Sequence, residues 1–217
     1  MNIAELTHET DLSKATYISF FNYFHTPGSV HSLFAERYGS RWCKADCLDS
    51  DQIEKLANVA VGNLKWLSKH VPPRVQMSNI RLHLNAWHTK MRYQQKENVE
   101  CVFCEVDGTE DRLEHFFHCS RLRECMPRCF QHSPFIHMPV KYWFLLKLRK
   151  PDKIIMALFI HAVYTMHNTY RHISSKGELA RSIERIMLDI PLRPALRRYV
   201  QGKINGALTL EYDGPAL

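Results

Sequence analysis

Four residues with the spacing of a zinc site constrain this chain more than any other feature. Cys101 and Cys104 form a CxxC pair, ten residues separate the second cysteine from His115, and three more lead to Cys119. A CxxC turn brings two thiolates close enough to share one metal ion, and residues four apart lie on one face of a helix. Three sulfurs and one imidazole fill a closed, tetrahedral Zn²⁺ site. The spacing therefore predicts a structural zinc centre.

The segment between the two halves of this pattern contains a helix-start signal. Thr109 can cap a helix whose first turn contains two acidic residues, one of them Asp111, and the helix dipole favours acids there. Such a helix would carry His115 and Cys119 on one face. His118 is the competing third ligand, but it directly precedes the last cysteine and would point away from it on a helix. The sequence favours the first histidine and leaves the second open.

The composition is typical of a folded, reduced, intracellular protein, nuclear or cytoplasmic. The chain has 217 residues, of which 45% are hydrophobic and 24% charged, enough for one medium domain or two small ones. The seven cysteines follow no signal peptide, and no apolar run approaches the roughly 18 residues of a membrane span. We therefore expect no membrane partner. The cysteines outside the zinc pattern are interpreted as structural or packing residues: Cys43, Cys47, Cys125 and Cys129.

The net charge of +7 is unevenly distributed along the chain. Residues 1–60 hold eight acidic and five basic residues, a local balance of −3, which leaves +10 for the remainder. A basic body with thirteen histidines suits a polyanionic partner such as nucleic acid, whereas basic surfaces are also often simply solvated. Charge alone therefore favours a nucleic-acid partner only weakly.

Apolar residues recur at helical spacing along most of the chain, and no long alternating pattern predicts strands. Asp49 is expected to open one helix, and Ser78 to cap another that extends to Met91. A longer helix from Pro151 to about His172 is apolar on more than one face and should be central and buried. The expected fold class is mainly α, a helical domain with a small embedded CCHC zinc knuckle.

The residues around the zinc pattern resemble a known family. An apolar and basic stretch contains Asn85 and a Thr-x-x-Arg motif ending at Arg92; the CxxC pair and an acidic spacer follow, and then Glu-His-Phe-Phe-His-Cys ending at Cys119. This order resembles the zinc-binding domain that follows the polymerase in non-LTR retrotransposon reverse transcriptases. The resemblance covers residues 76–130 well and residues 151–172 loosely. We therefore divide the chain into an N-terminal helical region (1–75), this zinc-binding domain (76–130) and a C-terminal helical region (131–217).

The resemblance implies nucleic-acid binding beside a polymerase, helping to hold template RNA or target DNA, and a reverse transcriptase polyprotein as a further partner. It also implies the zinc ligands Cys101, Cys104, His115 and Cys119. Contacts to phosphates rather than base edges are expected from basic residues that flank the knuckle. These candidates are Arg81, His88, Lys90, Arg92, Arg121 and Arg123.

No catalytic motif accompanies the zinc pattern, and we expect no enzyme. The paired aspartates of a Tyr/Phe-x-Asp-Asp polymerase hairpin are absent, and no acid-x-Lys follows Pro151-Asp152 as a nuclease would require. The expected function is a zinc-stabilised nucleic-acid-binding module without a polymerase or nuclease active site. One alternative is a zinc-stabilised helical scaffold for protein–protein interaction. Another is a degraded nuclease, whose acidic cluster near Asp152 only folding could assemble. The sequence leaves open the choice of RNA or DNA and the role of residues 1–75.

Overall fold

The computed structural model describes residues 29–42, 49–94, 99–106, 108–131, 139–172 and 178–206. Within these ranges the regular structure is helical, and the only β-type pairing is an isolated antiparallel bridge between Glu100 and Glu110. The predicted mainly α fold class is thereby confirmed. No helix in the same ranges is long and apolar enough to cross a bilayer.

The chain divides into two compact units, residues 1–61 and 62–217. The division falls within one continuous helix, α3 (Ser50–Leu67). The second unit contains both the zinc pattern and the C-terminal helices, whereas the three-region division drawn from the sequence stays a prediction.

In the first unit, a short α-helix continues into a π-helical turn. The helix α2 spans Ser29–Arg37, and η2 spans Tyr38–Trp42. The side chains of Phe34 and Tyr38 are buried and meet edge to face, with ring centroids 6.4 Å apart. Aromatic pairs in this geometry contribute roughly 0.5–1.5 kcal/mol beyond the area that they bury.

The start of α3 is capped as the sequence predicts. The Asp49 carboxylate accepts a hydrogen bond from the backbone N–H of Gln52 at 2.7 Å, and the Gln52 side chain accepts one from the Asp49 N–H at 3.2 Å. These reciprocal bonds form a capping box, which satisfies two backbone donors that a helix start otherwise leaves unpaired.

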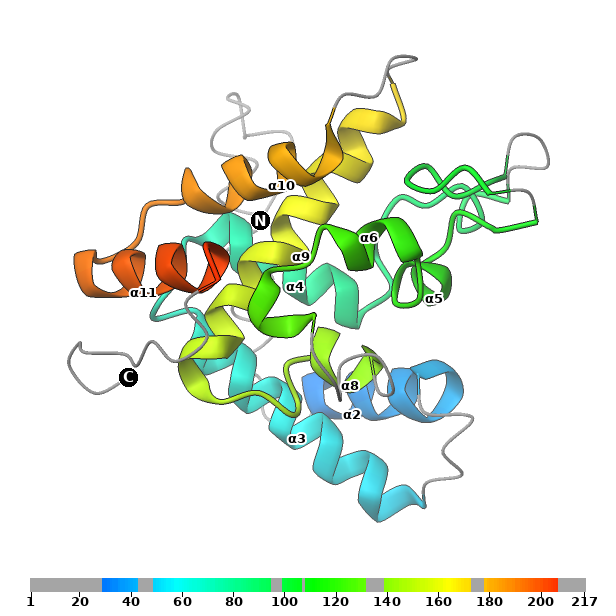
Figure 1. Ribbon diagram of the computed structural model, residues 1–217. Helices are drawn as coiled ribbons and strands as arrows, with labels where there is room; N and C mark the ends of the chain where they lie inside the picture. The colour runs from blue at the N-terminus through cyan, green and yellow to red at the C-terminus, as the bar shows by residue number, and fades with distance from the viewer. Residues whose placement is uncertain are drawn as a thin grey trace, which may run out of the picture. The chain divides into compact units, whose positions relative to one another are not determined.

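The second unit contains the remaining helices, of which one is much longer than the others. In chain order they are α4 (Pro73–His83), α5 (Leu113–Phe116), α6 (Ser120–Glu124), the 3₁₀ turn η4 (Arg128–Phe130), α8 (Pro139–Trp143), α9 (Lys150–Tyr170), α10 (Leu179–Leu188) and α11 (Pro194–Ile204). The longest of them, α9, contacts α4, α8, α10 and α11, and Figure 1 shows it running through the middle of this unit. Its side chains are buried on more than one face, which confirms the predicted central helix.

The prediction of a helix from Ser78 to Met91 is wrong at both ends. The helix α4 begins earlier, at Pro73, because proline suits the first helical position. It ends at His83, and Asn85 then adopts a left-handed conformation with φ 51°. The basic residues after position 85 therefore do not share a helix face with those before it.

A buried histidine at the end of α4 makes the stability of the fold sensitive to acid. The His83 ring is fully buried, with its centroid 4.7 Å from that of Phe144, and burial lowers its pKa to about 3. The unfolded chain binds a proton near pH 6.5, which the folded chain cannot do until about pH 3. The contribution to stability is therefore complete above pH 6.5 and is lost as the pH falls toward 3.

We expect the free energy of unfolding to fall by about 2 kcal/mol between pH 7 and pH 5 because His83 is protonated in the unfolded chain but not in the folded one. Urea denaturation at the two pH values measures this loss. In His83→Gln the pH dependence should be weaker by that amount, whereas the same change at exposed His172 should leave it unaltered. Equal pH dependence in wild type and His83→Gln would show that the buried imidazole is not responsible.

Candidate metal centre

The first two predicted ligands lie on a tight loop whose arms are held together by backbone hydrogen bonds. The Cys101 N–H donates to the Thr109 carbonyl at 3.1 Å, and the Asp111 N–H donates to the Val99 carbonyl at 2.7 Å. The loop turns back because the N–H of Glu105 donates to the Cys101 carbonyl at 3.0 Å. Both cysteines of the CxxC pair are thus on one compact turn.

The other two predicted ligands are not on one helix face, and the prediction of a helix starting at Thr109 is wrong. The helix α5 begins only after Arg112, whose backbone is extended (φ −144°, ψ 156°), and it is a single turn long. His115 lies on this turn, whereas Cys119 lies beyond it with a non-helical backbone (φ −59°, ψ 119°). Short turns, in which the N–H groups of His118 and Cys119 donate to the His115 and Phe116 carbonyls at 2.9 and 3.4 Å, carry the chain from one ligand to the other in place of a continuous α-helix.

The four predicted ligands nevertheless come together. Their ligand atoms, three sulfurs and one imidazole nitrogen, all lie within 4.8 Å of one another. Cys104 Sγ lies 3.3 Å from His115 Nε2. In a tetrahedral Zn²⁺ site, bonds of about 2.0–2.3 Å place neighbouring ligand atoms about 3.6–3.8 Å apart. The four residues are therefore close enough to hold a metal ion, with adjustments of less than about an ångström for this pair.

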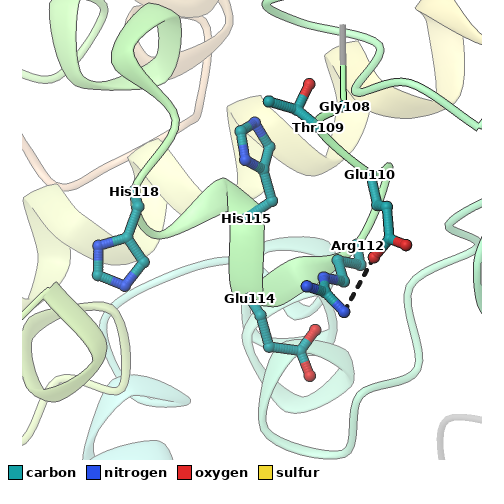
Figure 2. Close-up of a pocket in the computed structure, with 7 residues that line it drawn as sticks. All are labelled: Gly108, Thr109, Glu110, Arg112, Glu114, His115 and His118. Atoms are coloured by element: carbon teal, nitrogen blue, oxygen red, sulfur yellow. Dashed lines mark ion pairs between the residues drawn. The ribbon is translucent and has the colours of Figure 1, made fainter. Parts of the chain in front are cut away.

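His118 does not take part in this cluster. Its side chain is exposed, and Figure 2 shows the rings of His115 and His118 pointing in different directions. Of the two histidines that the sequence left open, the structure brings His115 to the sulfurs.

The burial and ionisation of the cysteines suit metal binding. Cys101 and Cys119 are buried, whereas Cys104 and His115 are half-buried. A hydrogen bond between the two buried sulfurs raises the pKa of Cys101 and lowers the pKa of Cys119 to about 5. The lowered pKa favours the thiolate form of Cys119, which is the form that binds metals.

A pocket of about 570 Å³ opens beside the half-buried side of the cluster. Its lining is mixed in charge and consists of Gly108, Thr109, Glu110, Arg112, Glu114, His115 and His118 (Figure 2). Arg112 and Glu110 form an ion pair across 2.9 Å. Of the four predicted ligands, His115 is the one that lines this pocket.

Two further residues of the site, Asp111 and His167, were not identified from the sequence. Both side chains are completely buried, and His167 Nε2 lies 3.2 Å from Asp111 Oδ2. Burial acts to raise the pKa of the Asp111 carboxyl, but the hydrogen bonds from His167 and from the Lys90 N–H outweigh it and hold the pKa below its usual range. An acidic residue at position 111 is also typical of a helix start. Its pairing with His167 can be recognised only in the structure, where α9 lies against the loop.

The other cysteines lie outside the cluster or outside the described residues. Cys125 and Cys129 are half-buried, and burial raises the pKa of their thiols to about 11 and about 12. Both are therefore neutral at physiological pH, as packing residues would be. Cys43 and Cys47 lie outside the residues that the structure describes.

The acidic cluster required by a degraded nuclease is not formed in the described part of the chain. There, the Cys/His cluster is the only group of three or more potential ligands close enough for a metal. Asp152 instead forms an ion pair with Arg149 at 3.2 Å and accepts a hydrogen bond from the Tyr199 hydroxyl at 2.7 Å. The Pro-Asp sequence serves as the start of α9.

The six candidate phosphate contacts differ in their availability. Arg81 is half-buried, donates a hydrogen bond to the Tyr164 hydroxyl and lies over that ring, 5.5 Å from its centroid. This guanidinium is engaged within the fold. His88 and Lys90 are half-buried, whereas the exposed candidates are Arg92, Arg121 and Arg123.

The two exposed arginines of α6 follow directly after the last ligand. Arg121 forms an ion pair with Glu124 at 2.9 Å, and Arg123 donates to the His118 carbonyl at 3.4 Å. An exposed ion pair of this kind contributes little to stability, so Arg121 can exchange partners. The helix α6 begins directly after Cys119, so both arginines lie within four residues of this predicted ligand.

Comparison with known proteins gives no relative from which function could be transferred. No protein-family model, no curated protein and no solved structure matches the chain. The resemblance to the reverse transcriptase zinc-binding domain therefore rests on the motif alone, and function must be argued from the site.

Proposed function

We propose that this chain is a zinc-stabilised helical module that binds nucleic acid through phosphates. The observation that carries the metal part is the convergence of Cys101, Cys104, His115 and Cys119, whose ligand atoms lie within 4.8 Å of one another. Three thiolates and an imidazole form a soft, tetrahedral ligand set, which favours Zn²⁺ over the oxygen-binding cations Mg²⁺ and Ca²⁺. Because four protein ligands leave no position for water or substrate, the metal has a structural and not a catalytic role.

The nucleic-acid part of the proposal is supported by charge near the metal. The chain carries a net charge of +7, and Arg92, Arg121 and Arg123 are exposed on the segments that flank the ligands. Guanidinium groups bind phosphate oxygens in a bidentate geometry. The same role is implied by the motif resemblance, in which the knuckle helps to hold template RNA or target DNA.

A salt titration tests this proposal. The zinc-loaded protein is expected to bind a fluorescent single-stranded RNA or a matched DNA duplex with an affinity that falls steeply as salt rises. Replacing Arg92, Arg121 and Arg123 together by alanine should weaken binding at least about tenfold at low salt. The slope of log affinity against log salt should then decrease by about 2–3, as expected for three lost phosphate contacts.

The matched control removes three exposed arginines far along the chain from the metal ligands: Arg181, Arg185 and Arg197. Its affinity and salt slope should stay close to those of the wild type. Equal losses in the two triple variants would place the contacts elsewhere. Absence of binding even at low salt would contradict nucleic-acid binding and favour the protein-scaffold alternative.

The scaffold alternative has less support in the described residues. A docking surface for a protein usually exposes a contiguous apolar patch. The large hydrophobic side chains exposed in the described ranges are Val59, Tyr93 and Val106. Single exposed apolar residues are common on monomeric proteins and need no partner.

A further inference from the structure

Asp111 joins the metal-binding loop to two other parts of the fold. Its Oδ1 atom accepts a hydrogen bond from the N–H of Val102 at 3.5 Å. Its Oδ2 atom accepts one from the N–H of Lys90 at 2.8 Å and lies 3.2 Å from His167 Nε2. One carboxylate thus contacts the CxxC loop, the turn after α4 and the central helix α9.

We propose that Asp111, held in place by His167, is the positioning residue of the metal centre. The inference rests on the proposed zinc site and adds to it a group that binds no metal itself. Its bond to Val102 acts between the two cysteines of the CxxC pair, so it fixes the turn on which both sulfurs are carried. Loops that must present two ligands to one metal need such a fixed turn, since ligand geometry sets metal affinity.

The energetic cost of this arrangement is an argument for a role beyond packing. A carboxylate with no exposed surface is stable only when charged or polar donors compensate for the lost hydration. An apolar residue could fill the same volume at lower cost. The buried charge at Asp111 instead satisfies two backbone N–H groups and one imidazole at once, and so fixes three segments in one relative geometry.

His167 is itself held rigidly, so it can anchor the carboxylate. Its ring lies among three aromatic side chains, with centroids 5.5 Å from Phe116, 6.0 Å from Phe103 and 6.3 Å from Trp87. Phe103 belongs to the CxxC loop and Phe116 to α5. The two halves of the ligand set therefore pack around the same histidine of α9.

The test replaces the carboxylate by an amide of the same shape. In Asp111→Asn we expect the affinity for Zn²⁺, measured by competition with a chromophoric chelator, to fall about 10–100-fold. Co²⁺ bound at the site should keep the visible absorption of a tetrahedral three-sulfur centre, because no ligand is lost. Amide hydrogen exchange at Val102 and Lys90 should become faster in the metal-loaded protein.

Matched variants separate positioning from general destabilisation. Glu110→Gln makes the same chemical change one residue away, at a partly exposed acid paired with Arg112, and should leave metal affinity within about twofold of wild type. His167→Leu removes the donor to Asp111 and should lower affinity as Asp111→Asn does. His167→Gln retains an N–H donor and should restore most of the affinity.

The outcomes distinguish this inference from the function on which it rests. Wild-type affinity in both Asp111→Asn and His167→Leu would overturn the positioning role while leaving the zinc site intact. Equal losses in Asp111→Asn and Glu110→Gln would also overturn it. A wild-type chain that takes up neither Zn²⁺ nor Co²⁺ would overturn the proposed metal function itself.

Discussion

Removal of the metal ion is expected to unfold the metal-binding segment, residues 99–106 and 108–124, while the helices around α9 stay folded. Structural Zn²⁺ contributes roughly 10–16 kcal/mol to the folding of isolated zinc-finger peptides. Here the segment has only a single turn in α5 and a short α6, whereas α9 is buried among α4, α8, α10 and α11. We therefore expect the segment to depend on a bound metal far more than the helical core does.

The substitution Cys104→Ser should reproduce this effect without a chelator. Serine keeps the size of the side chain but provides no thiolate, so zinc should be lost and the segment should lose protection against hydrogen exchange. The control is Cys125→Ser, which changes another half-buried cysteine outside the cluster and should retain both zinc and protection. Full protection of the segment in metal-free Cys104→Ser would show that the loop folds without metal.

The second large effect is expected at Trp87, where alanine should lower the free energy of unfolding by about 3–5 kcal/mol. The indole is completely buried, with its ring centroid 5.2 Å from Tyr164 and 6.2 Å from Phe116. Its N–H donates to the Ser78 carbonyl at 3.3 Å. Truncation therefore leaves a cavity between α9 and the turn that carries His115, and removes a buried hydrogen bond.

The matched control is Trp66→Ala, which removes the same side chain from a half-exposed position. There the indole lies against His70, with ring centroids 4.4 Å apart, and less of its surface leaves water on folding. We expect a loss of roughly 1 kcal/mol. Urea denaturation followed by circular dichroism compares the two variants. Equal losses at both positions would contradict the assignment of Trp87 to the core.

The sequence predicts the cluster of three cysteines and one histidine because local spacing and side-chain chemistry indicate it. The CxxC pair, His115 and Cys119 are recognisable as potential metal ligands without knowledge of the fold. The long apolar helix is predictable for a similar reason, since α9 is apolar around most of its circumference and has proline at its start. Both inferences depend on neighbours in the chain.

The remaining features depend on contacts between distant parts of the chain. The helical pattern of the sequence does not indicate the end of α4, because it gives no sign of the left-handed conformation that Asn85 adopts. The residues around Asp111 predict a helix start. Its partner, His167, lies 56 residues away, so no local pattern indicates that the two side chains are paired. Nothing near Arg81 in the sequence indicates that its guanidinium donates a hydrogen bond to the Tyr164 hydroxyl, which lies 83 residues away.

The most direct test of the central claim is the zinc content of the purified protein, measured by inductively coupled plasma and native mass spectrometry. We predict one zinc ion per chain in the wild type and in His118→Ala, and none in Cys104→Ser or His115→Ala. A wild-type chain without zinc, even after zinc is supplied, would contradict the account. So would one zinc ion per chain retained in both Cys104→Ser and His115→Ala.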